Sequence, residues 1–162
     1  MTAVVNLEER LAVTDLLHRE ARLLDAADFA AWLELYAPDA TYWIPSGLPP
    51  HDYRRKMSIV YDDHSAMQGR VERLASKFAF AQAPPSRTVR VLSNIEVEQR
   101  DGGGYIARCV YVTHELRMHR ERVLPARATY DLIDVGTGLL FGHKRLDLLA
   151  SNEPLEEIGF IL

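Results

Sequence analysis

The chain has 162 residues, the length of one ordinary domain, so we expect a single domain over residues 1–162. Its 48% apolar and 26% charged residues are typical of a globular protein and exclude a low-complexity or collagen-like chain. A net charge of −4, with no basic run longer than Arg54-Arg55-Lys56, argues against a nucleic-acid partner. The longest stretch without charged side chains has twelve residues, 40–51, which is too short to span a membrane. We therefore expect a soluble protein of the cytoplasm.

The N-terminal third predicts two helices. Apolar residues at helical spacing indicate a first helix whose polar side carries Glu8, Glu9, Arg19, Glu20 and Arg22. The apolar stripe of that helix contains Leu7, Leu11, Leu17, Ala21 and Leu24. Asn6 and Glu9 form a capping box at its start, and Asp25 begins its exit. Asp28 then caps a second helix over residues 29–36, which must end before Pro38.

Residues 40–44 predict a strand, and residues 45–63 form a long loop. Loops of this length in a compact domain are usually functional, so we expect this one to contact a partner. Asp63 caps a third helix over residues 64–76. Its apolar period is carried by Met67, Val71, Leu74 and Phe78.

After Pro84-Pro85 the sequence changes to four long runs rich in Val, Ile, Tyr and Thr, over residues 88–99, 105–120, 124–135 and 139–149. Glycine-rich turns at residues 101–104 and 136–138, and Pro125, separate them. Helices followed by long strands predict an α+β fold, in which a curved antiparallel sheet wraps around about three N-terminal helices to form a cone.

The sequence does not support a metal site. His114 and His119 lie five residues apart on a predicted strand and so point to opposite faces. His51, Asp62, Asp63 and His64 could converge only through loop folding, and a solvated loop with a helix cap is the simpler interpretation. The only cysteine, Cys109, lies within a strand, where we expect a buried, inert thiol in a reducing compartment.

Acid–base chemistry inside the cone is an alternative hypothesis. Asp25, Tyr42 and His114 could line a pocket in which a desolvated carboxylate beside a histidine or tyrosine acts as general base and acid. A filled pocket whose polar groups bond one another explains the same residues without chemistry. A carrier for a small apolar ligand is a third hypothesis.

Taken in order, several short motifs resemble the small, or β, subunit of aromatic-ring-hydroxylating dioxygenases, the Rieske non-haem iron oxygenases. The resemblance extends through nearly the whole chain. It rests on Arg19-Glu20-Ala21-Arg22-Leu23-Leu24-Asp25, Tyr61-Asp62-Asp63, Arg70-Val71, Arg73-Leu74, Pro84-Pro85-Ser86-Arg87-Thr88, Ser93-Asn94 and Arg145-Leu146-Asp147.

This resemblance implies a cone-shaped fold shared with nuclear transport factor two and scytalone dehydratase. It implies a non-catalytic structural subunit that forms a homotrimer and supports three large α subunits in a hexamer. The Rieske cluster and the mononuclear iron would belong to the large subunit, NADH would act through separate electron-transfer components, and this chain would carry no cofactor. Because the matching residues are mostly charged or in loops, we expect a subunit interface there. The expected interface residues are Tyr61, Asp62, Asp63, Arg70, Arg73, Ser86 and Arg87.

Overall fold

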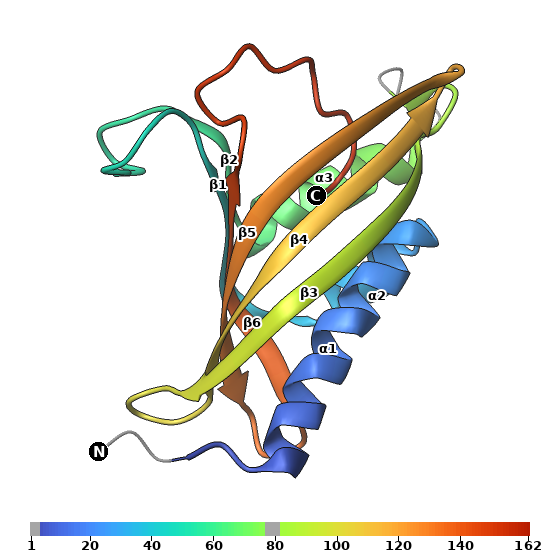
Figure 1. Ribbon diagram of the computed structural model, residues 1–162. Helices are drawn as coiled ribbons and strands as arrows, with labels where there is room; N and C mark the ends of the chain where they lie inside the picture. Colours follow the sequence, from blue (N-terminus) through green and yellow to red (C-terminus); the bar gives the residue numbers. More distant parts are fainter. Residues whose placement is uncertain (1–3, 77–81) are drawn as a thin grey trace.

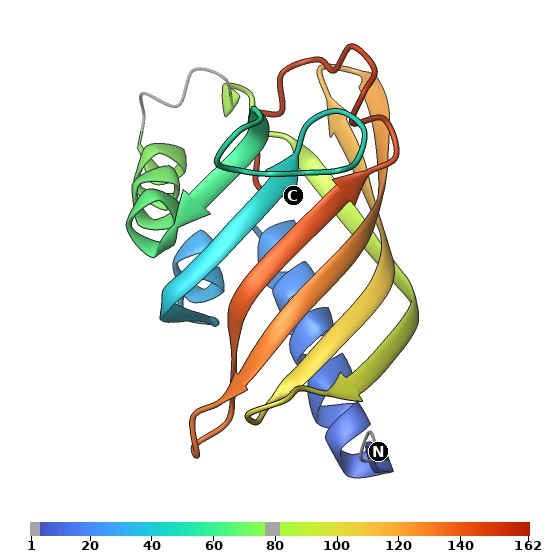
Figure 2. The same cartoon turned by 90° about the vertical axis from the view of Figure 1, so that its left-hand side faces the viewer.

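The computed structural model describes residues 4–76 and 82–162, and this part of the chain folds as one curved sheet with helices on its concave side (Figures 1 and 2). The described helices are α1 (Leu7–Asp25), α2 (Phe29–Leu33) and α3 (His64–Ala75). The strands are β1 (Tyr36–Pro45), β2 (Ser58–Asp63), β3 (Arg87–Gln99), β4 (Tyr105–Arg117), β5 (Arg120–Asp134) and β6 (Leu139–Leu148). The sheet order is β2-β1-β6-β5-β4-β3. The predicted α+β cone is confirmed.

The predicted helix starts are confirmed. The Asn6 side chain accepts a hydrogen bond from the Glu9 backbone at 2.9 Å, and the Glu9 carboxylate accepts one from the Asn6 backbone at 2.8 Å. Asp28 accepts from the Ala31 backbone at 3.2 Å, and α3 begins after Asp63. These bonds satisfy backbone donors that the first helical turn leaves without partners, so local sequence alone defines the starts.

Strand β1 differs from its prediction. The second helix ends at Leu33, short of the expected residue 36, and β1 begins at Tyr36, so that Pro38 lies inside the strand. The structure pairs β1 with β6 in parallel, from Thr41 opposite His143 to Trp43 opposite Arg145. The sheet is therefore mixed, and the expectation of a purely antiparallel sheet was wrong at this one pairing.

Strand β2 was also missed. The last six residues of the predicted loop, Ser58–Asp63, pair antiparallel with β1, with Tyr42 opposite Asp62 and Trp43 opposite Tyr61. A six-residue edge strand with a half-exposed pattern carries little hydrophobic periodicity. The remaining loop, residues 46–57, lies at the top of Figure 2, beside the chain that follows β6.

Pro125 does not mark a turn. It lies within β5, opposite Val112 of β4, and the hairpin turns instead at Met118 and His119, which both have positive φ angles of 52° and 63°. Backbone with this φ is the geometry that a two-residue hairpin needs, although neither residue is a glycine. His119 therefore lies in a turn and not on a strand. The expectation that His114 and His119 lie on one strand and point to its opposite faces was wrong.

The first helix is rotated relative to its predicted stripe. Leu17, Ala21 and Leu24 are buried, but Leu7 and Leu11 are 72% and 52% exposed because the start of α1 extends past the sheet, as Figure 1 shows. Val13 and Glu20 take their places on the buried side. Phe78, which was assigned to the period of the third helix, lies outside the described residues.

The mouth of the cone is closed by the last residues of the sequence. Residues 149–162 have no helix or strand, yet Phe160, Ile161 and Leu162 are all buried and belong to the main hydrophobic core. Trp32, Tyr42, Tyr130 and Phe141 fill the space beneath them. The interior of the cone is therefore packed with the chain's own side chains.

Candidate functional site

The centre of the cone contains a buried ion pair. The Lys144 ammonium nitrogen lies 2.8 Å from Oε1 of Glu20, and both side chains are 0% exposed. Glu20 comes from the C-terminal half of α1, and Lys144 points inward from β6, which lies between β1 and β5 in the curved sheet. An isolated buried charge would cost several kcal/mol, so each group depends on the other.

Three aromatic side chains complete the shell of Glu20. Trp32 Nε1 donates to Oε1 at 3.1 Å, Tyr36 OH donates to Oε1 at 2.6 Å, and Tyr130 OH donates to Oε2 at 3.1 Å. Burial alone would raise the pKa of the Glu20 carboxyl, but the Lys144 charge and these hydrogen bonds outweigh burial and lower it. Glu20 is therefore ionised near neutral pH and acts as a structural anchor, not as a proton donor.

The other face of Lys144 meets the C-terminal segment. Its ammonium donates to the Leu162 oxygen at 2.8 Å and lies 4.9 Å from the centre of the Tyr111 ring. Tyr42 OH donates to the same Leu162 oxygen at 3.0 Å. Burial raises the pKa values of the Tyr42 and Tyr111 hydroxyls far above the ordinary range, so both stay protonated.

A second buried cation lies near the rim. The Arg90 guanidinium donates to Asp25 Oδ1 at 2.5 Å and to the main-chain oxygen of Ile161, while the Arg90 backbone donates to Asp25 Oδ2 at 3.0 Å. Thr88 also donates to Asp25, at 3.1 Å. Asp25 thereby fixes the end of α1 to the edge strand β3, and Arg90 connects both to the C-terminal segment.

The three residues of the acid–base hypothesis do not converge. Asp25 and His114 line an open surface groove of about 430 Å³, whereas Tyr42 lies in the interior and bonds Leu162. Asp25 is already occupied by Arg90 and Thr88, and His114 is exposed on the outer side of β4. This arrangement favours structural roles for Asp25 and Tyr42.

Several of the expected interface residues also have partners within the chain's own fold. Buried Asp62 pairs with half-buried Arg70 at 2.8 Å, joining β2 to α3. Asp63 accepts from the Ala66 backbone at 2.8 Å and so caps α3. Ser86 donates to Glu115 at 2.6 Å, joining the start of β3 to β4.

The remaining expected interface residues are exposed. Arg73 lies in the last turn of α3, and Arg87 is the first residue of β3. Tyr61 is 41% exposed and stacks on Tyr53 with ring centres 4.4 Å apart. These three side chains remain available to a partner.

The long loop folds over the outer face of β1 and β6. His51 of the loop contacts the Arg145 guanidinium at 2.8 Å, and Arg145 lies over the Trp43 ring at 4.6 Å. Asp147 holds Arg145 through both carboxylate oxygens, at 2.7–3.0 Å. The loop is therefore anchored by the Arg145 guanidinium, which contacts both the Trp43 ring and the Asp147 carboxylate. The same loop places Tyr53 beside Tyr61.

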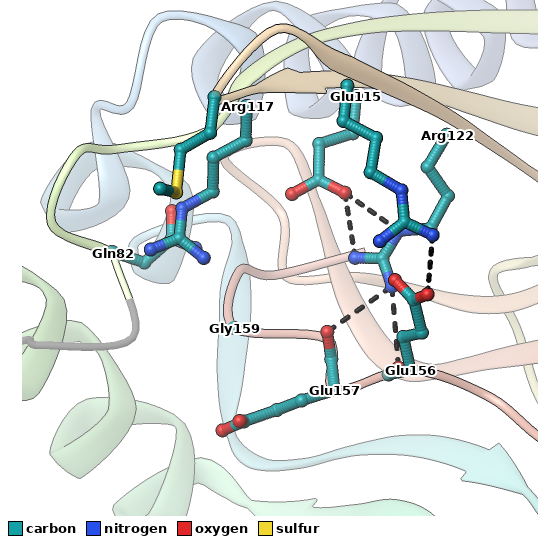
Figure 3. Close-up of a pocket in the computed structure, with 9 residues that line it drawn as sticks. Gln82, Glu115, Arg117, Arg122, Glu156, Glu157 and Gly159 are labelled. Carbon is teal, nitrogen blue, oxygen red and sulfur yellow. Dashed lines mark hydrogen bonds and ion pairs between the residues drawn. The ribbon is translucent and has the colours of Figure 1, made fainter.

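A charged hollow of about 240 Å³ lies beside the tip of the β4–β5 hairpin (Figure 3). Arg122 pairs with buried Glu115 at 2.7 Å and donates to the main-chain oxygens of Glu156 and Glu157 at 3.3 and 3.2 Å. Arg120 pairs with the Glu156 carboxylate at 2.5 Å. These contacts, drawn as dashed lines in Figure 3, join the hairpin to the segment that leads to the buried C-terminal residues.

Within residues 4–76 and 82–162, no group of three or more His, Cys, Asp or Glu side chains could hold a metal ion. Over the same residues, no helix is both long and apolar enough to cross a membrane. Cys109 is buried as predicted, and burial raises the pKa of its thiol to about 12, so it is unreactive.

The ion pair at the centre of the cone was missed in the sequence, although two signals pointed to it. Glu20 lies three residues after Leu17 and four before Leu24, within the apolar stripe of α1. Lys144 lies two residues before Leu146 and four before Leu148. It therefore shares the face of β6 from which these two leucines reach the core. A buried ion pair produces this pattern, in which two residues of opposite charge each occupy a position that the apolar spacing predicts to be buried.

A curved sheet closed by helices places the chain in the cone-shaped fold class. An NTF2-like protein with a cystatin-like fold from Novosphingobium aromaticivorans matches 91% of this chain and 86% of its own length with a TM-score of 0.63. Its sequence identity is 17%, so this likeness concerns the fold alone.

The family follows from the sequence comparison. Residues 19–152 match the family described as ring hydroxylating beta subunit. The small oxygenase component of the p-cumate 2,3-dioxygenase system of Pseudomonas putida is 32% identical over 156 residues, which cover 94% of this chain and 87% of that protein. The chain belongs to the family of beta subunits of ring-hydroxylating dioxygenases.

Two further relatives agree. The beta subunit of toluate 1,2-dioxygenase from Pseudomonas putida is 40% identical over 97 residues, which cover 56% of this chain and 60% of the relative. The match therefore spans less than two thirds of that protein. The crystal structure of the beta subunit of benzoate 1,2-dioxygenase from Burkholderia mallei has a TM-score of 0.77 and 26% identity, covering 98% of this chain and 99% of that one.

Proposed function

We propose that this chain, as one cone-fold domain, is the non-catalytic small subunit of an aromatic-ring-hydroxylating dioxygenase. The observation that carries the proposal is the packed interior: the cone that could hold a substrate is filled by Phe160, Ile161 and Leu162, and its central Glu20 and Lys144 neutralise each other. A cone whose central charges neutralise each other and that holds no free acid–base pair suits support and not turnover.

The partner would be the large subunit, which would carry the Rieske cluster and the mononuclear iron, with NADH acting through separate electron-transfer proteins. We propose three copies of each subunit, assembled around a homotrimer of this chain in the cytoplasm. Closed cyclic symmetry is the simplest way for identical chains to form a finite assembly. Exposed Tyr61, Arg73 and Arg87 are the candidate contact residues.

The names of the relatives support a substrate class for the whole enzyme. Three of the similar proteins are subunits of enzymes named for toluate, p-cumate and benzoate, which are all aromatic carboxylates. We therefore propose that the assembled enzyme oxidises a benzoate-like acid and that this chain does not contact it.

The test is co-expression of this chain with the large subunit of a ring-hydroxylating dioxygenase, followed by affinity capture and light scattering. We expect a complex of three and three subunits, and a trimer for the chain alone. Arg87→Ala should weaken both the complex with the large subunit and the trimer. Losing one partner of a buried interfacial charge pair costs about 2–5 kcal/mol, whereas losing an exposed pair costs under about 1 kcal/mol. Arg100→Ala, an exposed arginine at the far end of β3, is the control. A monomer that captures no large subunit would contradict the proposal.

A further inference from the structure

We propose that the centre of the cone is a receptor for a short apolar peptide segment, and that residues 158–162 occupy it as a separable intramolecular ligand. The contacts of Leu162, the contacts of Ile161 and the weak attachment of the preceding segment each support this inference. The inference concerns this chain alone and is independent of any large subunit.

The first contact set recognises Leu162. Its oxygen accepts hydrogen bonds from the Lys144 ammonium at 2.8 Å and from Tyr42 OH at 3.0 Å, and its N–H lies 3.2 Å from the same Tyr42 oxygen. Lys144 and Tyr42 are almost completely buried. A charged donor at this depth gives a short, strong bond to a main-chain oxygen and leaves no room for water to replace it.

The second contact set recognises the residue before it. The Arg90 guanidinium donates to the Ile161 oxygen, and the Arg90 side chain is only 1% exposed. Two successive main-chain oxygens are thus each held by a buried cation from a different strand, β6 or β3. Because residues 154–162 lie in no helix or strand, these side-chain donors replace the ladder bonds that usually hold an extended segment.

Apolar contacts supply the rest of the site. Phe160, Ile161 and Leu162 are buried in the main hydrophobic core, and Phe160 and Ile161 also line a cavity of about 210 Å³ together with Ile44 of β1 and Val60 of β2. The chemistry of the site therefore selects aliphatic or aromatic side chains at the last positions, together with accessible main-chain oxygens. A short peptide that carries such residues is the class of ligand that fits.

The attachment outside the cone is weak, which makes the segment separable. Arg120 and Glu156 are 72% and 59% exposed in their side chains, and ion pairs at such positions contribute little. Arg122 reaches the Glu156 and Glu157 oxygens only at 3.2–3.3 Å. The segment can therefore open without unfolding the sheet, and its tether returns it at high effective concentration.

The test measures binding of a fluorescein-labelled peptide with the sequence of residues 155–162 to the full chain by fluorescence anisotropy. Phe160→Ala loosens the tethered segment without changing the receptor, so this variant should bind the peptide at least about tenfold more tightly than the unmodified chain. Adding Tyr42→Phe, which removes a receptor hydroxyl, should abolish the gain. Adding Tyr36→Phe should keep it, because Tyr36 bonds Glu20 and not the segment.

Equal binding by all four proteins would overturn the proposal. Hydrogen exchange provides a second arm that does not depend on the folding of Phe160→Ala. In the unmodified chain the amides of residues 158–162 should exchange faster than those of β4 and β5. Tyr42→Phe should increase the exchange rate of the amides of residues 158–162 selectively. Exchange of the segment at the same rate as the strands in both proteins would show that it leaves only on global unfolding, and would also overturn the proposal.

Discussion

The Lys144 ammonium nitrogen and Glu20 Oε1 lie 2.8 Å apart, although 124 residues separate them in the sequence and neither side chain is exposed to solvent. This pair joins α1, the first helix, to β6, the last strand along the chain. Through Lys144 it also reaches Leu162, so it links three distant parts of the chain at one point.

Lys144→Met should lower the free energy of unfolding by about 3–5 kcal/mol, because it leaves the Glu20 carboxylate buried without its counter-charge. Urea denaturation followed by circular dichroism measures the loss. The double variant Glu20→Leu/Lys144→Met should lose less than the sum of the two single variants, because replacing both charges leaves no buried ion. Additive losses would mean that the two side chains contribute independently.

The protein should lose stability in acid through Glu20. The pKa of this carboxyl is lower in the folded chain than its ordinary value of 4.5, so the unfolded chain binds more protons in acid. The stabilisation is complete above pH 4.5 and disappears as the pH falls through the folded value. Urea midpoints between pH 7 and pH 3 measure this decline.

A matched pair of variants assigns that decline to its source. Tyr36→Phe removes a hydrogen bond that lowers the Glu20 pKa and should therefore make the acid decline shallower. Tyr42 bonds Leu162 and not Glu20, so Tyr42→Phe should leave the slope of the acid decline unchanged. Identical slopes in both variants would place the acid sensitivity elsewhere.

Glu115→Gln should cost about 1.5–3 kcal/mol of stability, because buried Glu115 accepts bonds from Arg122 and Ser86 and Arg122 would lose its counter-charge. Glu156→Gln removes only an exposed pair with Arg120 and should cost under about 1 kcal/mol. Thermal or urea unfolding of the two variants compares them. Equal losses would contradict the difference in burial.

Asp25→Asn should destabilise the chain by about 1.5–3 kcal/mol, because it weakens the bonds to Arg90 and Thr88. His114→Ala should change stability by less than about 0.5 kcal/mol, since His114 is exposed. Both variants should leave the turnover of a reconstituted oxygenase, per folded complex, within about tenfold of the parent. A thousandfold loss with the assembly intact, or isomerase or dehydratase turnover by this chain alone, would instead establish chemistry in the cone.

The sequence determined the features that depend on neighbouring residues. The capping box of Asn6 and Glu9 and the cap at Asp63 were predicted correctly, because their partners lie three residues away. The succession of long strands after residue 85 followed from β-branched runs separated by glycines, and it led to the correct fold class. The same local motifs supported the correct family.

Only the tertiary structure decided which residues meet across the chain. The parallel pairing of β1 with β6 and the edge strand β2 depend on partners distant in sequence, which hydrophobic periodicity does not encode. Glu20 was assigned to the polar side of its helix because a carboxylate is normally solvated, and its burial is possible only where Lys144 arrives from β6. Asp25, Tyr42 and His114 were grouped by chemistry, but Tyr42 lies in the interior and bonds Leu162, whereas Asp25 and His114 line a surface groove. Local sequence thus set the helix starts and the long strands, while long-range charge neutralisation and packing decided how the cone is closed.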